Sequence, residues 1–158
     1  MVKSDDAMHS RALGLLLAVV LASLSALHVF WAAGGRWGAA VAIPRRAVSA
    51  AVSDRPAFTP RPAGTLLVAL GLAAAAALVL AQAGAVSLPL GARWIKAGTL
   101  ALGVLFLLRA IGDFRYVGVF KSVRGTDFAR YDTFLFIPLC VLLGGGALWL
   151  ALSRRAAS

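Results

Sequence analysis

An arginine and an aspartate lie four residues apart at the end of a long apolar segment. In a continuous helix, Arg109 and Asp113 would share a face at ion-pairing distance. An arginine inside a membrane-spanning helix usually faces the protein interior or water, and it marks a candidate functional site. Arg115 and Tyr116 follow directly. Together with Lys121, the two arginines could bind an anion, because guanidinium binds carboxylate and phosphate bidentately. The alternative is structural, with the pair only fixing the end of a helix.

A second candidate group lies in the first apolar segment. His28 and Trp31 are three residues apart and would share a helix face, with Trp37 shortly after them. The histidine could act as a general acid or base with Asp113 or Tyr116. Alternatively, His28 is a hydrogen-bonded packing residue, and the tryptophans belong to the aromatic belt at a membrane interface.

Other charged residues have structural interpretations. Asp132 and Thr133 precede the last apolar segment, so we expect Asp132 to cap the N-terminus of the helix that follows. The charges from Lys121 to Arg130 are expected to form a solvated face at the lipid headgroups.

Four long apolar segments must position all of these residues. A helix of about 20 residues spans roughly 30 Å, the thickness of the hydrocarbon core of a bilayer. We therefore predict an all-α integral membrane protein, a four-transmembrane-helix bundle forming one domain. The expected membrane domain covers 12–153, with spans at about 13–34, 64–83, 94–113 and 133–153, between a polar tail at 1–11 and a basic tail at 154–158.

The side of the membrane on which each connection lies determines which candidate residues could be close together. Four spans place both termini on one side of the membrane and the 36–63 and 114–132 connections on the other. Prolines in 36–63 oppose a continuous helix, and its segment 38–52 could lie along the membrane surface. The helix ends that carry the candidate residues would then converge in one polar pocket. Lys and Arg are divided ten to six in favour of the side with the connections, a weak indication that this side is cytoplasmic.

The composition narrows the class of function. The chain is 61% hydrophobic and 14% charged, with a net charge of +10. Basic residues at the edges of apolar runs favour a lipid bilayer, with anionic lipids, as the partner rather than nucleic acid. The single cysteine, Cys140, excludes intramolecular disulfide exchange, and the chain has too few His and Cys residues for a zinc site. A bis-histidine haem within one subunit needs two membrane histidines, and His9 lies outside the first predicted span. We therefore expect no metal and no cofactor.

Two stretches resemble a known family. They are HVFWAAGGRWG at 28–38, followed by Pro44, and RAIGDFRYVGVFKSVRGTDFARYDTFLFIPLC at 109–140. Together they are similar to the bacterial membrane family called domain of unknown function 3995, whose pattern has H-x-x-W-x-x-G-G-x-W and R-A-I-G-D-F-R-Y blocks. The resemblance implies a small membrane protein of four helices. It supplies no catalytic residues, because the family carries no established activity.

The sequence favours a non-catalytic protein in a bacterial cytoplasmic membrane that binds a small molecule, a lipid headgroup or a partner at the polar pocket. A membrane-embedded enzyme using His28 with Asp113 or Tyr116 is an alternative. A transporter using Asp113 in a homo-oligomer is another. The ligand-binding candidates are His28, Trp31, Trp37, Arg109, Asp113, Arg115 and Tyr116.

Overall fold

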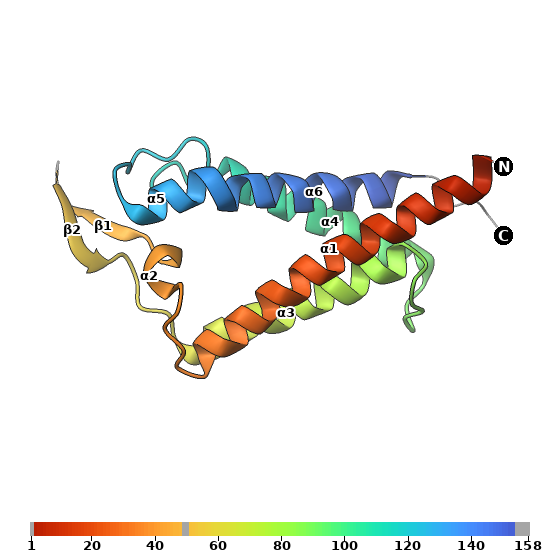
Figure 1. Ribbon diagram of the computed structural model, residues 1–158, viewed down its shortest axis with the longest axis horizontal. Helices are drawn as coiled ribbons and strands as arrows, with labels where there is room; N and C mark the ends of the chain where they lie inside the picture. Colours follow the sequence, from red (N-terminus) through yellow and green to blue (C-terminus); the bar gives the residue numbers. More distant parts are fainter. Residues whose placement is uncertain (1, 49–50, 154–158) are drawn as a thin grey trace.

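The computed structural model describes residues 2–48 and 51–153 and contains four helical segments long enough to cross a bilayer (Figure 1). The length and apolar composition of each segment meet the requirement for a span. The prediction of a four-helix membrane bundle is therefore confirmed. The segments are α1 (Val2–Ala32), α3 (Pro62–Gln82), α4 (Ala92–Ile111) and a continuous run of α5 (Asp127–Tyr131), η1 (Asp132–Phe136) and α6 (Ile137–Leu152).

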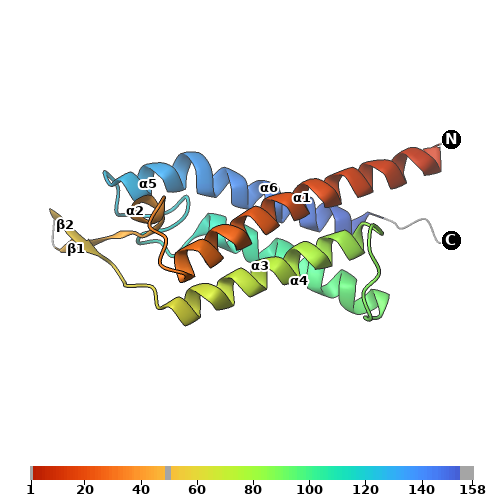
Figure 2. The same cartoon turned by 60° about the horizontal axis from the view of Figure 1, so that its bottom comes forward.

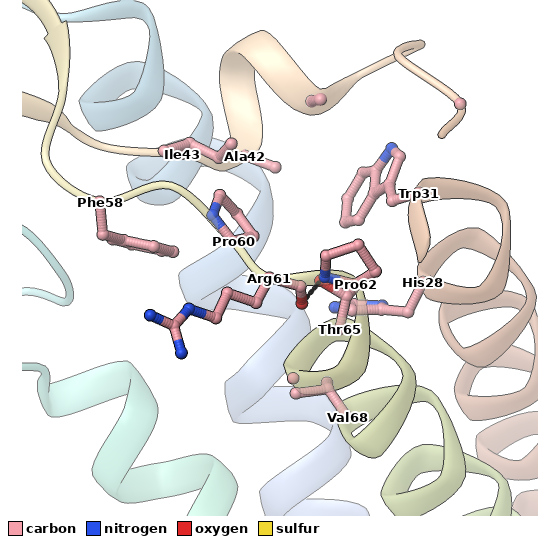
Figure 3. A pocket seen from close by; sticks show the side chains of 13 residues that line it. His28, Trp31, Ala42, Ile43, Phe58, Pro60, Arg61, Pro62, Thr65 and Val68 are labelled. Carbon is pink, nitrogen blue, oxygen red and sulfur yellow. Dashed lines mark hydrogen bonds between the residues drawn. The ribbon is translucent and has the colours of Figure 1, made fainter. Parts of the chain in front are cut away.

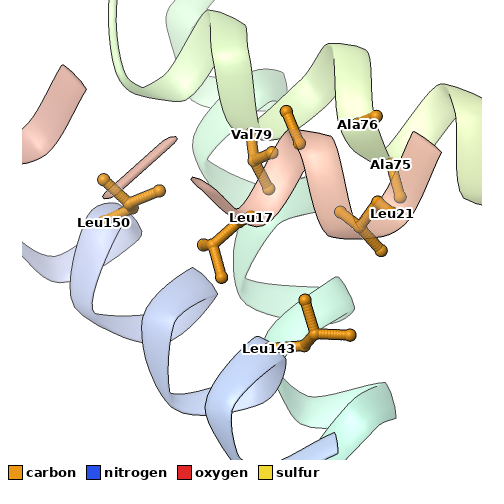
Figure 4. Close-up of a cluster of buried hydrophobic side chains, with 8 residues drawn as sticks. Leu17, Leu21, Ala75, Ala76, Val79, Leu143 and Leu150 are labelled. Atoms are coloured by element: carbon orange, nitrogen blue, oxygen red, sulfur yellow. The ribbon is translucent and has the colours of Figure 1, made fainter. Parts of the chain in front are cut away.

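The four spans are arranged as two tightly packed pairs. Helix α1 packs along α3, and α4 packs along α6, while the contacts between the two pairs are much fewer. The main core joins the pairs in the half of the bundle nearer the chain termini, where Leu17 and Leu21 meet Val79, Leu143 and Leu150 (Figure 4). Towards the opposite end the α1/α3 pair and the α4/α6 pair diverge (Figures 1 and 2).

Close approach within the α4/α6 pair depends on two glycines. A Cβ added at Gly144 would lie 2.9 Å from the carbonyl oxygen of Gly103 and 2.9 Å from the side chain of Leu107. Small residues at such a crossing let two helix backbones approach, which is a common basis of helix association in membranes. The glycines therefore keep α4 and α6 together as one unit.

A short helix and a β-hairpin form the first long connection. Helix α2 (Ala39–Ala42) is followed by β1 (Arg45–Val48) and β2 (Ala51–Pro56), which pair antiparallel with Ala47 opposite Val52. The prolines do exclude a continuous helix here, but the hairpin was not expected from the sequence. Helix α2 also contacts α5, so the connection bridges the two pairs at their divergent end.

The fourth span begins earlier than expected, and Asp132 is not its cap. Thr126 caps it instead, because its hydroxyl accepts a hydrogen bond of 3.0 Å from the backbone N–H of Ala129. Asp132 lies inside the helix, where the backbone N–H of Ile137 donates to the Asp132 carbonyl in a widened π turn. That turn precedes Pro138, whose ring would clash with the carbonyl of Phe134 in a regular α-helix.

Candidate functional site

A pocket lies at the divergent end, between the last turns of α1 and the first turns of α3. Its volume is about 480 Å³, within the range of roughly 300–1,000 Å³ typical of small-molecule sites. Figure 3 shows His28 and Trp31 on one side, with Ile43 and Phe58 from the connection opposite. All lining residues fall between positions 28 and 68: His28, Trp31, Gly35, Ala39, Ala42, Ile43, Phe58, Pro60, Arg61, Pro62, Gly64, Thr65 and Val68.

His28 is held in a defined orientation at this pocket. Its Nδ1 lies 2.8 Å from the carbonyl oxygen of Leu24, and its ring meets that of Trp31 edge-on with centroids 5.0 Å apart. A carbonyl can only accept a hydrogen bond, so Nδ1 carries the hydrogen. In the neutral ring Nε2 is then the acceptor. His28 can therefore accept a hydrogen bond from a hydroxyl or amide group in the pocket.

Trp31, in the pocket wall, forms a hydrogen bond with the segment that follows α1. Its Nε1–H donates a hydrogen bond of 2.8 Å to the carbonyl oxygen of Trp37. The Trp37 side chain is itself exposed and does not line the pocket. Of the two tryptophans predicted as ligand-binding candidates, only Trp31 therefore presents its ring to this cavity.

Among the described residues, the lining of the pocket contains one full positive charge and no negative one. Arg61 lines it, while Asp113, Asp127 and Asp132 do not. Among the described side chains no carboxylate forms an ion pair with Arg61. Its backbone carbonyl accepts a hydrogen bond of 3.2 Å from the hydroxyl of Thr65, at the start of α3. An anionic group entering the pocket would therefore meet a guanidinium that none of the described carboxylates neutralises.

A second polar cluster lies at the same end of the molecule, within the α4/α6 pair. Asp132 is fully buried and accepts from both Arg109 and Lys121, at 3.0 Å and 3.1 Å. The backbone N–H of Gly118 donates a further bond of 2.8 Å to this carboxylate. Lys121 also donates to Thr133 at 2.7 Å, and its side chain is only 4% exposed. Such a carboxylate with three donors can hold the chain segments around it together.

Two predictions about these residues were wrong. Arg109 does not pair with Asp113, because α4 ends at Ile111 and Gly112 turns the chain with φ 95°. The i to i+4 geometry assumed for the pair therefore does not exist. Lys121 is not on a solvated face either, since the loop folds back and buries it against Asp132.

The loop at 112–126 is organised by Asp113 and two glycines. Asp113 Oδ1 accepts hydrogen bonds of 2.7 to 2.9 Å from the backbone N–H groups of three successive residues, 115 to 117. A Cβ at Gly118 would come within 2.4 Å of Gly112, so the two glycines allow the chain to cross itself. Partial burial alone would raise the pKa of Asp113, but the three backbone donors outweigh it and hold the pKa below its usual value.

Arg115 and Tyr116 belong to this loop rather than to the pocket. The guanidinium of Arg115 lies over the ring of Tyr116, 5.3 Å from its centroid, a cation–π contact. Neither residue lines the cavity. The predicted convergence is thus divided: His28 and Trp31 line the pocket, whereas Arg109, Asp113, Arg115 and Tyr116 lie in or beside the loop.

Sequence reasoning did not select Arg61, and it did not predict that Lys121 is buried against Asp132. Arg61 precedes Pro62 at the start of a charge-free run, and this position at a helix entrance was an available signal. Nothing in the local sequence separates Lys121 from the other basic residues of its loop. Among the residues that the structure describes, no three His, Cys, Asp or Glu side chains are grouped so as to hold a metal ion.

The family comparison covers both the pocket and the cluster. The model of the family described as Protein of unknown function (DUF3995) matches residues 21–147. The chain belongs to this family. No curated protein and no solved structure matches it. The DUF3995 match includes the end of α1, all pocket residues and the whole 112–126 loop, so both polar sites lie within the part of the chain that defines the family.

Proposed function

We propose that this membrane protein is a non-catalytic binding protein whose ligand occupies the pocket between α1 and α3. One observation carries the proposal: a cavity of about 480 Å³ brings His28, Trp31 and Arg61 together with mainly apolar neighbours. Ligand sites typically combine an apolar lining with a few polar groups that fix orientation. Here the free ring nitrogen of His28 and the guanidinium of Arg61 supply those groups.

Binding is favoured over the two alternatives. An enzyme using His28 with Asp113 or Tyr116 would need these groups in one cavity, and only His28 lines it. Asp113 Oδ1 is already engaged by three backbone donors of its own loop. A transporter using Asp113 would require that carboxylate within a span, whereas it follows the end of α4 at Ile111.

The proposed setting is the bacterial cytoplasmic membrane, as the family resemblance implies. The pocket lies at the end of the bundle formed by the two long connections (Figure 1). The excess of Lys and Arg on that side supports a cytoplasmic face for the pocket.

A pocket-filling substitution tests this function. Gly64 lines the pocket, and a Cβ there would meet no atom within 4 Å. Gly64→Leu should therefore fill the cavity without disturbing the helix, and the added side chain should favour helix formation. Gly71 is the matched control, because it lies seven residues along the same helix face, also has open space and does not line the pocket.

The measurement is mass spectrometry of small molecules retained by protein purified in mild detergent. Wild type and Gly71→Leu should retain the same defined molecule, and Gly64→Leu should retain about tenfold less, because overpacking a site costs more than about 1 kcal/mol. Equal retention by all three proteins would contradict binding in this pocket.

A further inference from the structure

The pocket has a charged residue at its outer end and mainly apolar residues in the rest of its lining. Arg61 immediately precedes α3, and Val68 lies about 10 Å further along the helix axis at 1.5 Å per residue. Because α3 begins at Pro62 and continues as a span, the outer end lies at the membrane boundary and the inner end at hydrocarbon depth. The charged residue of the lining therefore lies at the membrane boundary, and Val68 lies at hydrocarbon depth.

The inner end of the pocket is also open on the side of α3. Val68 is about half exposed although it lines the cavity, and Leu67 beside it is exposed as well. In a bilayer these apolar side chains contact lipid. A chain-like apolar group could therefore extend from the pocket into the bilayer without being surrounded by protein.

We propose that the ligand is an anionic amphiphile, with its charged head at Arg61 and its hydrocarbon chain running past Thr65 and Val68. This inference rests on the proposed function and specifies the ligand class. The head is assigned as anionic because Arg61 is the only formal charge in the lining and has no ion-pair partner among the described side chains. The chain is assigned as apolar because most of the lining is apolar and because Val68, at the inner end of the cavity, is exposed on a span.

The Nε2 atom of His28 adds a hydrogen-bond acceptor to the groups that the ligand would meet in the pocket. With Nδ1 donating to Leu24, the neutral ring offers Nε2 as an acceptor. A hydroxyl elsewhere on the ligand could donate to this nitrogen, while the negative charge lies at Arg61, whose side chain extends away from His28 (Figure 3). A cationic head would be repelled by Arg61.

Trp31 gives a direct optical test of this proposal. Trp37, Trp94 and Trp149 are replaced by Phe, which leaves Trp31 in the pocket wall as the only tryptophan. The protein is placed in uncharged phosphatidylcholine nanodiscs. It is then titrated with a brominated long-chain fatty acid, with the methyl ester of that acid and with 4-bromobenzoate, an unreactive anion without a hydrocarbon chain, and bromine quenching of Trp31 is recorded.

The brominated fatty acid should quench Trp31 saturably, and the uncharged methyl ester and 4-bromobenzoate should be at least about tenfold weaker. Arg61→Gln should weaken the fatty acid about tenfold, the size expected for one charge-assisted hydrogen bond. Gly64→Leu should abolish saturable quenching, and Gly71→Leu should leave it unchanged.

Three outcomes would overturn the proposal. Equal quenching by the methyl ester would mean that the charge is not recognised, and equal quenching by 4-bromobenzoate would mean that the chain is not needed. Unsaturable quenching unaffected by Gly64→Leu would mean that only bulk lipid is sensed. In each case the mass-spectrometric comparison of wild type with Gly64→Leu is a separate test. Loss of a retained molecule in Gly64→Leu would show that the pocket binds a ligand of another class.

Discussion

At the scale of single residues, one carboxylate in the described chain is both fully buried and paired with two cations. Asp132 is 0% exposed and is shared by two cations and a backbone N–H. Removing one partner of a buried ion pair leaves an uncompensated charge, and this cost exceeds the loss of the pair itself. Lys121 would bear that cost, because its side chain is buried while that of Arg109 is 35% exposed.

Asp132→Asn should therefore destabilise the protein by about 3–5 kcal/mol. The stability can be followed by thermal unfolding in detergent, with Asp127→Asn as the control. Asp127 is an exposed aspartate five residues away, so its substitution should change stability by less than about 0.5 kcal/mol. Indistinguishable unfolding of the two variants would show that Asp132 does not organise this end of the α4/α6 pair.

At the scale of elements, the spans were predictable because a charge-free apolar run of about 20 residues is typical of a membrane-spanning helix. The residues at their ends were harder to assign. The pair of Arg109 with Asp113 assumed that α4 continues, although Gly112 was a signal for its end. Thr126 and Asp132 are both good capping residues by type, so local sequence could not choose between them. The actual partner of Arg109 lies 23 residues away and depends on tertiary structure.

The 112–126 loop should depend on the ionised carboxylate of Asp113. In Asp113→Ala the backbone amides of residues 115 to 117 lose their common acceptor. Their hydrogen exchange, corrected for intrinsic rates, should be about tenfold faster or more, since one net hydrogen bond to a charged group contributes roughly 1.5–3 kcal/mol. Asp127→Ala serves as the control, and unchanged exchange in Asp113→Ala would contradict this account of the loop.

The same loop should loosen in acid. Because folding lowers the pKa of Asp113, its contribution to stability is fully present above the unfolded pKa of about 3.9 and is lost as the pH falls through the lower folded value. Protection of residues 115 to 117 in the wild type should accordingly decrease only below about pH 4. If protection were instead lost near neutral pH, a titrating group other than Asp113 would control the loop.

At the scale of the whole molecule, the sequence predicted the bundle and the side on which the candidate residues lie. It did not predict that α1 pairs with α3 and α4 with α6, or that these pairs diverge. Similar apolar helices carry little information about their neighbours, since packing in membranes depends on detailed shape. The single pocket expected from topology is consequently divided into a cavity on the α1/α3 pair and a closed ion cluster on the α4/α6 pair.

The account's central claim is that the ligand binds in the α1/α3 pocket and not at the charged loop. Photocrosslinking tests it most directly, with p-benzoyl-phenylalanine placed at Phe58 in one protein and at Phe120 in another. The two side chains are similarly exposed, 55% and 60%, but only Phe58 lines the pocket. After irradiation in native membranes, we predict an adduct of one defined mass at position 58 and only heterogeneous bulk-lipid adducts at position 120. The same set of adducts at both positions would contradict the claim.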